Sequence, residues 1–142
     1  MAIYSGGVRT TLSSAAAPIV EIRTTATDRV KILEIGIFLV SATAAIFGIG
    51  RPAAIGTTIT TSITMLAEDS GDPVGTGTLA TAWTTRPTVP ANFFRRVALP
   101  ATIGAGVILT FPKGLIVAIS NSVVIWNITT APLADVYMVT DE

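Results

Sequence analysis

Apolar and polar residues alternate along short segments of this chain, a pattern typical of β-strands. In Ile19–Thr24, Val20 and Ile22 face one side of a predicted strand. Glu21 and Arg23 face the other side, so we expect this strand to be half-buried. No long window places apolar residues at i, i+3, i+4 and i+7 opposite charged ones, and the pattern therefore predicts no long helix.

A longer segment, Val30–Val40, begins with the same alternation and then becomes apolar on both faces. Such a strand lies at the centre of a sheet or under a partner. The uncharged stretch Ile35–Gly50 is shorter than the roughly 18–20 residues that a membrane-spanning helix needs. We interpret it as two paired strands that meet near residues 41–43, and we expect no membrane association.

Gly, Pro, Asn and Asp separate the remaining β-branched runs, as turns would. Further strands are expected at Ala45–Arg51, Ile63–Ala67, Thr78–Thr84, Phe93–Leu99, Gly106–Phe111, Leu115–Ile119, Ser122–Ile128 and Asp135–Thr140. Residues 53–62 are expected to form a loop, and Pro112–Gly114 a turn. Turn signals roughly every 8–12 residues are typical of a β-sandwich or a barrel.

The predicted fold is all-β, a single antiparallel β-sandwich of the jelly-roll type. An immunoglobulin-like sandwich is the alternative, although it usually needs fewer residues and the Cys…Trp…Cys spacing is missing. Residues 1–14 are mostly small and polar, and we expect them to form an extended N-terminal arm. Residues 15–142 would then form the sandwich domain. Deleting the arm is expected to leave the fold intact.

The composition is unusual because charged residues make up 13% of the 142 residues, against about 25% in a typical soluble domain. Hydrophobic residues make up 50%. A soluble monomer rarely leaves so much uncharged surface open. This favours a homo-oligomer whose surface is partly covered by other subunits, and a monomer coated with Thr and Ser is the alternative.

The charges further limit the partners. Nine basic and nine acidic residues give a formal net charge of zero, and only Arg95 and Arg96 are adjacent basic residues. Proteins that bind nucleic acids need a basic stripe to meet the phosphates. We therefore expect no nucleic-acid partner.

The chain contains neither His nor Cys. Their absence excludes His-based catalytic triads, thiol chemistry and the usual zinc sites. An enzyme would depend on two carboxylates flanking a cleft, and no pattern supports such a pair. Glu34 is expected to pair with Arg23, Arg29 or an arginine of a neighbouring subunit. The acidic segment Glu68–Asp72 is expected to be a solvated turn, since its spacing does not match a calcium-binding loop. We thus expect no enzyme activity, no cofactor and no metal.

Six residues are candidates for contact with a partner. Aromatic residues and arginines are enriched at interfaces, and Asn92–Arg96 places two of each side by side. The second group lies in the N-terminal arm, which we expect to reach a neighbouring protein. The candidates are Ile3, Tyr4, Phe93, Phe94, Arg95 and Arg96. Trp83 would be the main candidate if the protein bound sugars, whereas Trp126 is expected in the core.

Two long segments carry a resemblance to a known group of proteins. They are LEIGIFLVSATAAIFGIGRPAAIG (Leu33–Gly56) and LPATIGAGVILTFPKGLIVAISNSVVIWNIT with the terminal ADVYMVTDE (Leu99–Glu142). These segments resemble small decoration, or cement, proteins of jelly-roll type that are encoded among the head genes of tailed phages. The resemblance brings no catalytic residues with it.

That resemblance implies a structural virion protein. Such a protein would form a homotrimer on the outer surface of the capsid, bind the lattice of the major capsid protein and stabilise it. The alternative is a receptor- or carbohydrate-binding jelly-roll module of a phage tail or fibre.

Overall fold

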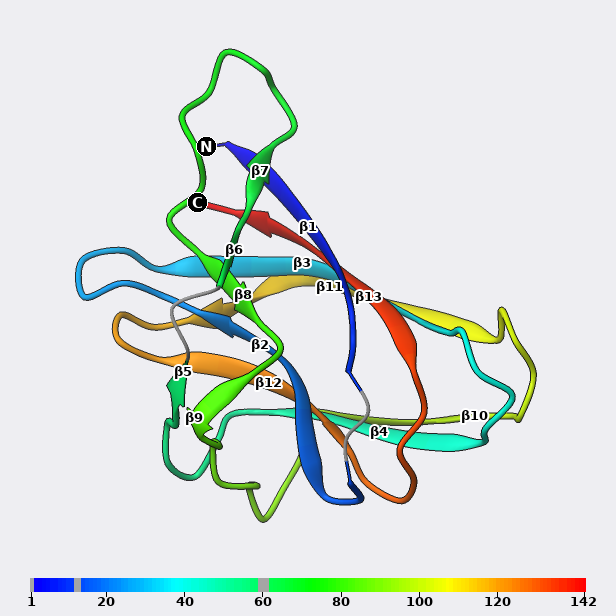
Figure 1. Ribbon diagram of the computed structural model, residues 1–142. Coiled ribbons are helices and arrows are strands. Elements are labelled where there is room, and N and C mark those ends of the chain that lie inside the picture. The colour runs from blue at the N-terminus through cyan, green and yellow to red at the C-terminus, as the bar shows by residue number, and fades with distance from the viewer. Residues whose placement is uncertain (1, 12–13, 59–61) are drawn as a thin grey trace.

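The protein is an all-β antiparallel sandwich (Figure 1). The computed structural model describes residues 2–11, 14–58 and 62–142, and these ranges contain no helix. The strands are β1 (Ile3–Arg9), β2 (Ala17–Arg23), β3 (Val30–Leu39), β4 (Ala45–Gly50), β5 (Thr57–Thr58), β6 (Ile63–Thr64), β7 (Leu66–Ala67), β8 (Thr78–Ala80), β9 (Trp83–Thr85), β10 (Arg95–Leu99), β11 (Gly106–Val117), β12 (Ser122–Asn127) and β13 (Ala134–Asp141).

Two sheets form the layers of the sandwich. Sheet A has the strand order β11-β3-β13-β1-β7, and sheet B has the order β10-β4-β12-β2-β8-β6. The chain changes sheet between most of the long strands, and all the pairings are antiparallel. As a result, β10 and β11 form the edges of the two sheets at one side of the sandwich, and β6 and β7 form the edges at the other side.

Residues 3–9 belong to the sandwich and do not form a separate arm. β1 pairs with β13 over its full length, from Ile3 opposite Asp141 to Arg9 opposite Asp135, and with β7 on its other side. A small residue is needed at Gly6, because this position lies against the side chains of Met65 and Leu79, where a larger residue would not fit. Residues 1, 12 and 13 of the predicted arm lie outside the described residues.

Two other expectations about pairing are wrong. β3 and β4 do not pair, because β3 lies in sheet A and β4 in sheet B, so the intervening residues 40–44 cross from one layer to the other. Pro112–Gly114 does not form the expected turn either. β11 continues through it, and a bulge between Thr110 and Leu115 shifts its register against β3. Gly114 has a φ of +71°, which a bulge can require and which glycine adopts without strain.

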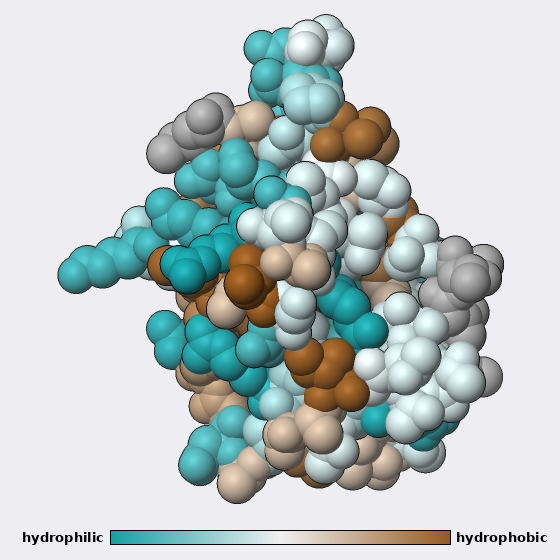
Figure 2. Space-filling view, turned by 90° about the vertical axis from the view of Figure 1, so that its left-hand side faces the viewer, coloured by the Kyte–Doolittle hydropathy of each residue, from teal (hydrophilic) through white to brown (hydrophobic). Residues whose placement is uncertain are grey.

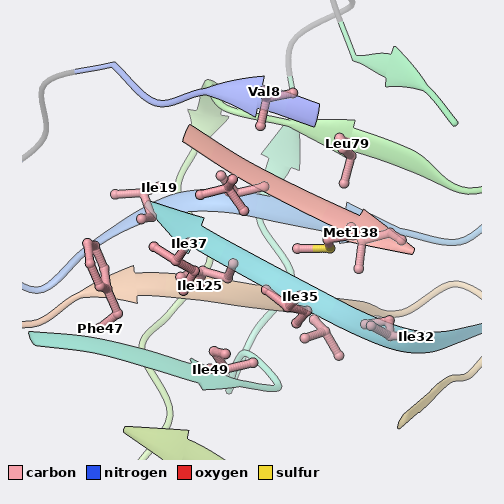
Figure 3. Close-up of a cluster of buried hydrophobic side chains, with 14 of the residues drawn as sticks. Val8, Ile19, Ile32, Ile35, Ile37, Phe47, Ile49, Leu79, Ile125 and Met138 are labelled. Atoms are coloured by element: carbon pink, nitrogen blue, oxygen red, sulfur yellow. The ribbon is translucent and has the colours of Figure 1, made fainter. Parts of the chain in front are cut away.

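The core lies between the two sheets (Figure 3). Ile35 and Ile37 from β3 and Met138 from β13 face residues of sheet B that include Ile49 and Ile125. The accessible surface of the chain is 6891 Å², close to the roughly 6,900 Å² that a compact monomer of this mass exposes. The single chain therefore completes its own core.

An outer layer covers the far face of sheet B. It consists of residues 51–58 and 83–94, in which β5 pairs with β9 and Ala54 forms a bridge with Thr88. Phe93 of this layer packs edge-on against Trp126 of β12, with ring centroids 5.8 Å apart. Trp126 is buried as expected, but β2 is buried on both faces and is not the half-buried strand that its alternation predicts.

Candidate functional site

The outer face of sheet A is not covered in the described part of the chain, in contrast to that of sheet B. Side chains alternate along each strand, so the residues between the core positions point outward. We call this surface the open face. Its residues are Ile3, Ser5, Gly7 and Arg9 of β1, Asp135, Tyr137, Val139 and Asp141 of β13, Lys31, Glu34, Gly36 and Phe38 of β3, and Ile108, Thr110 and Ile116 of β11.

Two aromatic rings lie near the centre of the open face. Each ring lies over a glycine of the next strand: a Cβ at Gly36 would overlap the Tyr137 ring, and one at Gly106 would overlap the Phe38 ring. The two rings are nearly parallel, at 15°, with centroids 6.3 Å apart. Gly36 lies opposite Tyr137 and Gly106 opposite Phe38, and these glycines allow the two rings to lie flat on the sheet.

Within the described chain, Glu34 pairs with neither Arg23 nor Arg29. The Tyr137 hydroxyl donates a 2.6 Å hydrogen bond to Glu34 Oε1, and no arginine pairs with this carboxylate among the described residues. The bond to the Glu34 carboxylate, together with burial, raises the pKa of Tyr137 above its ordinary value of 10.0. The Tyr137 hydroxyl is therefore protonated and uncharged near pH 7.

A shallow depression of about 290 Å³ adjoins the rings, lined by Gly7, Val8, Arg9, Phe38, Asp135, Val136 and Tyr137. Gly7 creates space there because it has no side chain. Arg9 and Asp135 both line the depression, and Arg9 donates two hydrogen bonds to Asp135, of 2.7 and 2.8 Å. The Arg9 guanidinium lowers the pKa of the Asp135 carboxyl below its ordinary value.

A second surface lies along the edge formed by β10 and β11. Arg95, Phe111, Pro112, Lys113 and Gly114 line a hollow of about 370 Å³, which we call the basic hollow. The Arg95 guanidinium lies 5.9 Å from the centroid of the Phe111 ring, within range of a cation–π interaction.

The structure divides the six predicted contact residues into three groups. Tyr4 is buried in the core, and Phe93 and Phe94 are half-buried and pack against Trp126 and the core, respectively. These three have structural roles within the chain.

Ile3 is half-buried on the open face, whereas Arg95 and Arg96 are exposed on the β10 edge. The Arg96 guanidinium lies 6.0 Å from the Phe93 ring centroid. Ile3 and the two arginines therefore lie on two different surfaces of the molecule.

Trp83, the main candidate under the alternative of sugar binding, holds the outer layer to sheet B. Its Nε1 donates a 2.5 Å hydrogen bond to Glu21 Oε2, and Arg23 Nη2 donates one of 2.9 Å to Glu21 Oε1. Arg23 also donates to the carbonyl of Gly56. Glu21 is completely buried by this cluster, so the polar edge of Trp83 is not free for a ligand.

The segment Glu68–Asp72 forms an exposed turn after β7, as expected from its composition. Asp69 Oδ1 accepts a hydrogen bond from the Gly71 backbone N–H. Within the described ranges, no three potential metal ligands come together, and no helix could span a membrane.

The open face could not be found by searching for adjacent aromatic and basic residues. Its members come from four strands, and Phe38 and Tyr137 are 99 positions apart in the sequence. The available signal was the glycine in each neighbouring strand, at Gly36 and Gly106, because glycine inside a strand often marks a close approach.

Comparison with protein-family models, with curated proteins and with solved structures finds no match.

Proposed function

We propose that this protein is a structural component of a tailed-phage virion, a jelly-roll decoration protein that binds the outer surface of the capsid as a homotrimer. Its partner would be the lattice of the major capsid protein. A ligand that binds only the assembled lattice stabilises that lattice by mass action. The sequence resemblance supports this proposal, as does the strand order, in which eight long strands divide equally between two sheets.

The observation that carries the proposal is the difference between the two outer faces of the sandwich. Sheet B is covered by the chain's own outer layer, while sheet A leaves a broad face of four long strands uncovered among the described residues. A protein that lies on a large partner needs a broad face of this kind.

The chemistry of the open face suits contact with a protein surface. Arg9 pairs with Asp135 and Lys31 with Asp141, so four of its charges compensate each other. Apolar side chains lie among them, and Ile108 is 53% exposed. Attachment would then depend on shape and apolar contact, with little long-range steering.

Ile108→Glu tests this proposal, because it places a charge on the open face without altering the core. We expect the wild-type protein to cosediment with shells of the cognate major capsid protein and to raise their resistance to heat. Ile108→Glu is expected to weaken binding at least tenfold. Ile119→Glu is the matched control, since Ile119 is 46% exposed but follows β11 and lies off the open face. Wild-type protein that stays in the supernatant would overturn the proposal.

A second function, glycan binding, is favoured by one observation. Phe38 and Tyr137 present nearly parallel rings beside a shallow depression that the Arg9–Asp135 pair also lines. Aromatic faces and planar polar groups are the combination that stacks on and hydrogen-bonds to a sugar ring. A saturable change in tyrosine fluorescence with polysaccharides, abolished by Tyr137→Ala, would support this alternative. No change across a glycan panel would exclude it.

A further inference from the structure

Four basic residues gather on the β10–β11 side of the molecule without acidic partners. Arg51, Arg95, Arg96 and Lys113 form no ion pair with any carboxylate of the described residues. Arg51 instead donates to the Ile116 carbonyl at 2.9 Å, and Arg95 to that of Phe94. The basic hollow, lined by Arg95 and Lys113, therefore has uncompensated positive charge.

The acidic loop, residues 68–76, lies at the opposite edge of sheet A. It follows β7, while the basic hollow lies on β11, and these two strands are the first and last in the sheet order. The loop projects beyond the sandwich at the top of Figure 1, and Figure 2 shows its hydrophilic tip. Glu68, Asp69 and Asp72 are exposed there and form no ion pair with described residues.

The acidic loop is held in shape before it meets any partner. Glu142 accepts hydrogen bonds from the backbone N–H groups of Thr76 and Gly77 at the base of the loop. At the tip, Asp69 accepts bonds from the N–H groups of Gly71 and Asp72. A preformed loop loses little conformational entropy on binding.

The tip of the loop matches the hollow in apolar character as well as in charge. Val74 is 71% exposed beside Asp72, and the hollow offers Phe111 and Pro112 beside Lys113. An apolar side chain flanked by a carboxylate can thus meet an aromatic and proline surface flanked by a cation.

We propose that the acidic loop of one copy of the chain docks in the basic hollow of the next copy. This names the contact behind the self-association that the proposed function includes, and it uses a surface separate from the open face. The contact is head-to-tail, since two different patches meet, and such contacts close into rings when the rotation allows.

The net charge of zero is consistent with this arrangement. The unpaired positive groups of the basic hollow and the unpaired negative groups of the acidic loop lie at opposite edges of sheet A, so identical edges repel each other and unlike edges attract. Edge-to-edge pairing of two β11 strands is also disfavoured. Pro112, Lys113 and the bulge at Thr110 interrupt that edge, and these are features that block strand addition.

Charge reversal tests the contact. Lys113→Glu and Asp72→Lys each place like charges at the junction, and we expect each to weaken self-association, measured by sedimentation velocity, at least tenfold. Asp72 is chosen because Asp69 shapes the turn. The double variant Lys113→Glu/Asp72→Lys is expected to recover association, because the charges are again complementary. Arg86→Glu is the matched control, with the same charge change on an exposed residue of the outer layer.

Each result decides the matter. A wild-type protein that remains monomeric at every concentration tested, or a Lys113→Glu variant that behaves like Arg86→Glu, would overturn the proposal. Failure of the double variant to recover, with circular dichroism showing it folded, would also overturn it. Shell cosedimentation is measured separately. A monomer that still binds shells would contradict only the proposed contact between copies. An oligomer that does not bind shells would contradict only the proposed capsid function.

Discussion

At the scale of single residues, Glu21 is a buried charged group that needs hydrogen-bond partners and a cation. It is completely buried on the outward side of β2, and burying a carboxylate is costly unless it is paired and hydrogen-bonded. Arg23 and Trp83 supply donors to its two oxygens. Because Arg23 and Trp83 come from sheet B and the outer layer, the same cluster joins these two parts of the molecule.

Replacing Arg23 with Met tests how much this cation contributes to stability. The variant leaves Glu21 buried without its cation, and breaking such a pair should lower the free energy of unfolding by about 2–4 kcal/mol. Arg9→Met is the control, since the Arg9 and Asp135 side chains are 64% and 47% exposed and an exposed ion pair contributes little to stability. Urea denaturation of both variants checks the prediction, and equal losses would contradict it.

Two glycines in one row of sheet A differ in what their missing side chain does. Gly7 and Gly36 both lie opposite Tyr137, on its two neighbouring strands. A Cβ at Gly36 would overlap the Tyr137 ring, whereas the nearest atom to a Cβ at Gly7 lies 3.9 Å away.

Gly36→Ala should therefore destabilise the protein by about 1–3 kcal/mol, the usual effect of overpacking, because the Tyr137 ring must move and its bond to Glu34 must break. Gly7→Ala should change the free energy of unfolding by less than about 1 kcal/mol, since it meets ordinary contact distances. Thermal unfolding of the two variants measures the difference. A Gly7→Ala variant as unstable as Gly36→Ala would show that the ring position is not the cause.

At the scale of elements, β1 is where sequence pattern and structure diverge most. Glycine, serine and threonine dominate residues 1–14, which is why an arm is predicted. Yet Tyr4 and Val8 are buried in the core, and β1 provides the strand between β13 and β7. Glycines there permit close packing, and composition alone cannot distinguish that use from flexibility.

Deleting residues 1–9 should consequently prevent cooperative folding, contrary to the expectation drawn from composition. The deletion removes two core side chains and leaves the edge of β13 unpaired. The variant should lose its cooperative thermal transition in circular dichroism. Arg9→Ala and Ser5→Ala alter exposed or half-exposed side chains of the same strand and should keep it. A deletion variant that melts cooperatively would restore the arm interpretation.

The strand positions themselves were predictable, because alternation and turn residues are local features. The ranges expected for β3, β4, β12 and β13 agree with the structure to within a residue or two. Pairing was not predictable, since it depends on which distant segment completes each layer. β3 and β4 are separated by only five residues and lie in different sheets, and the proline and glycine at 112–114 mark a bulge where local rules indicate a turn.

At the scale of the whole molecule, low charge has a different origin on each side of the sandwich. Sheet B needs apolar residues on both faces because the outer layer covers it, as the complete burial of β2 and β12 shows apart from Arg23. Sheet A is open, and four of the five charges on its outer face pair with each other. Part of the apolar excess is therefore explained within one chain, and only the open face and the edges are left to partners.

The pH dependence of stability is also a property of the whole molecule. The chain has no His and no Cys, the side chains whose ordinary pKa values lie nearest neutrality. The free energy of unfolding should therefore change little between about pH 5 and 9.

Below that range stability should fall, for a reason that two carboxyls share. Hydrogen bonds from Thr27 and Thr25 lower the pKa of Asp28, and Arg9 lowers that of Asp135, both from an ordinary value of 3.8. A lowered folded-state pKa means that the unfolded chain binds protons more tightly. The stabilisation is therefore complete above the ordinary pKa of 3.8 and is lost as the pH falls through the lower folded-state pKa. Asp135→Asn should make the acid limb shallower in urea titrations at several pH values, and an unchanged limb would contradict this assignment.

At high pH the sign is reversed. Burial raises the pKa of Tyr4, with the nearby charges of Asp72 and Glu142 adding to it, and the bond to Glu34 raises that of Tyr137. The folded protein then holds these protons more tightly than the unfolded chain, so the stabilisation is complete below pH 10.0 and is lost as the pH rises through the folded-state values. Tyrosinate absorbance should accordingly appear in the folded protein only above the range in which it appears in urea. Tyr137→Phe should remove one of the two late-titrating groups, and tyrosines that titrate alike in folded and unfolded protein would contradict the prediction.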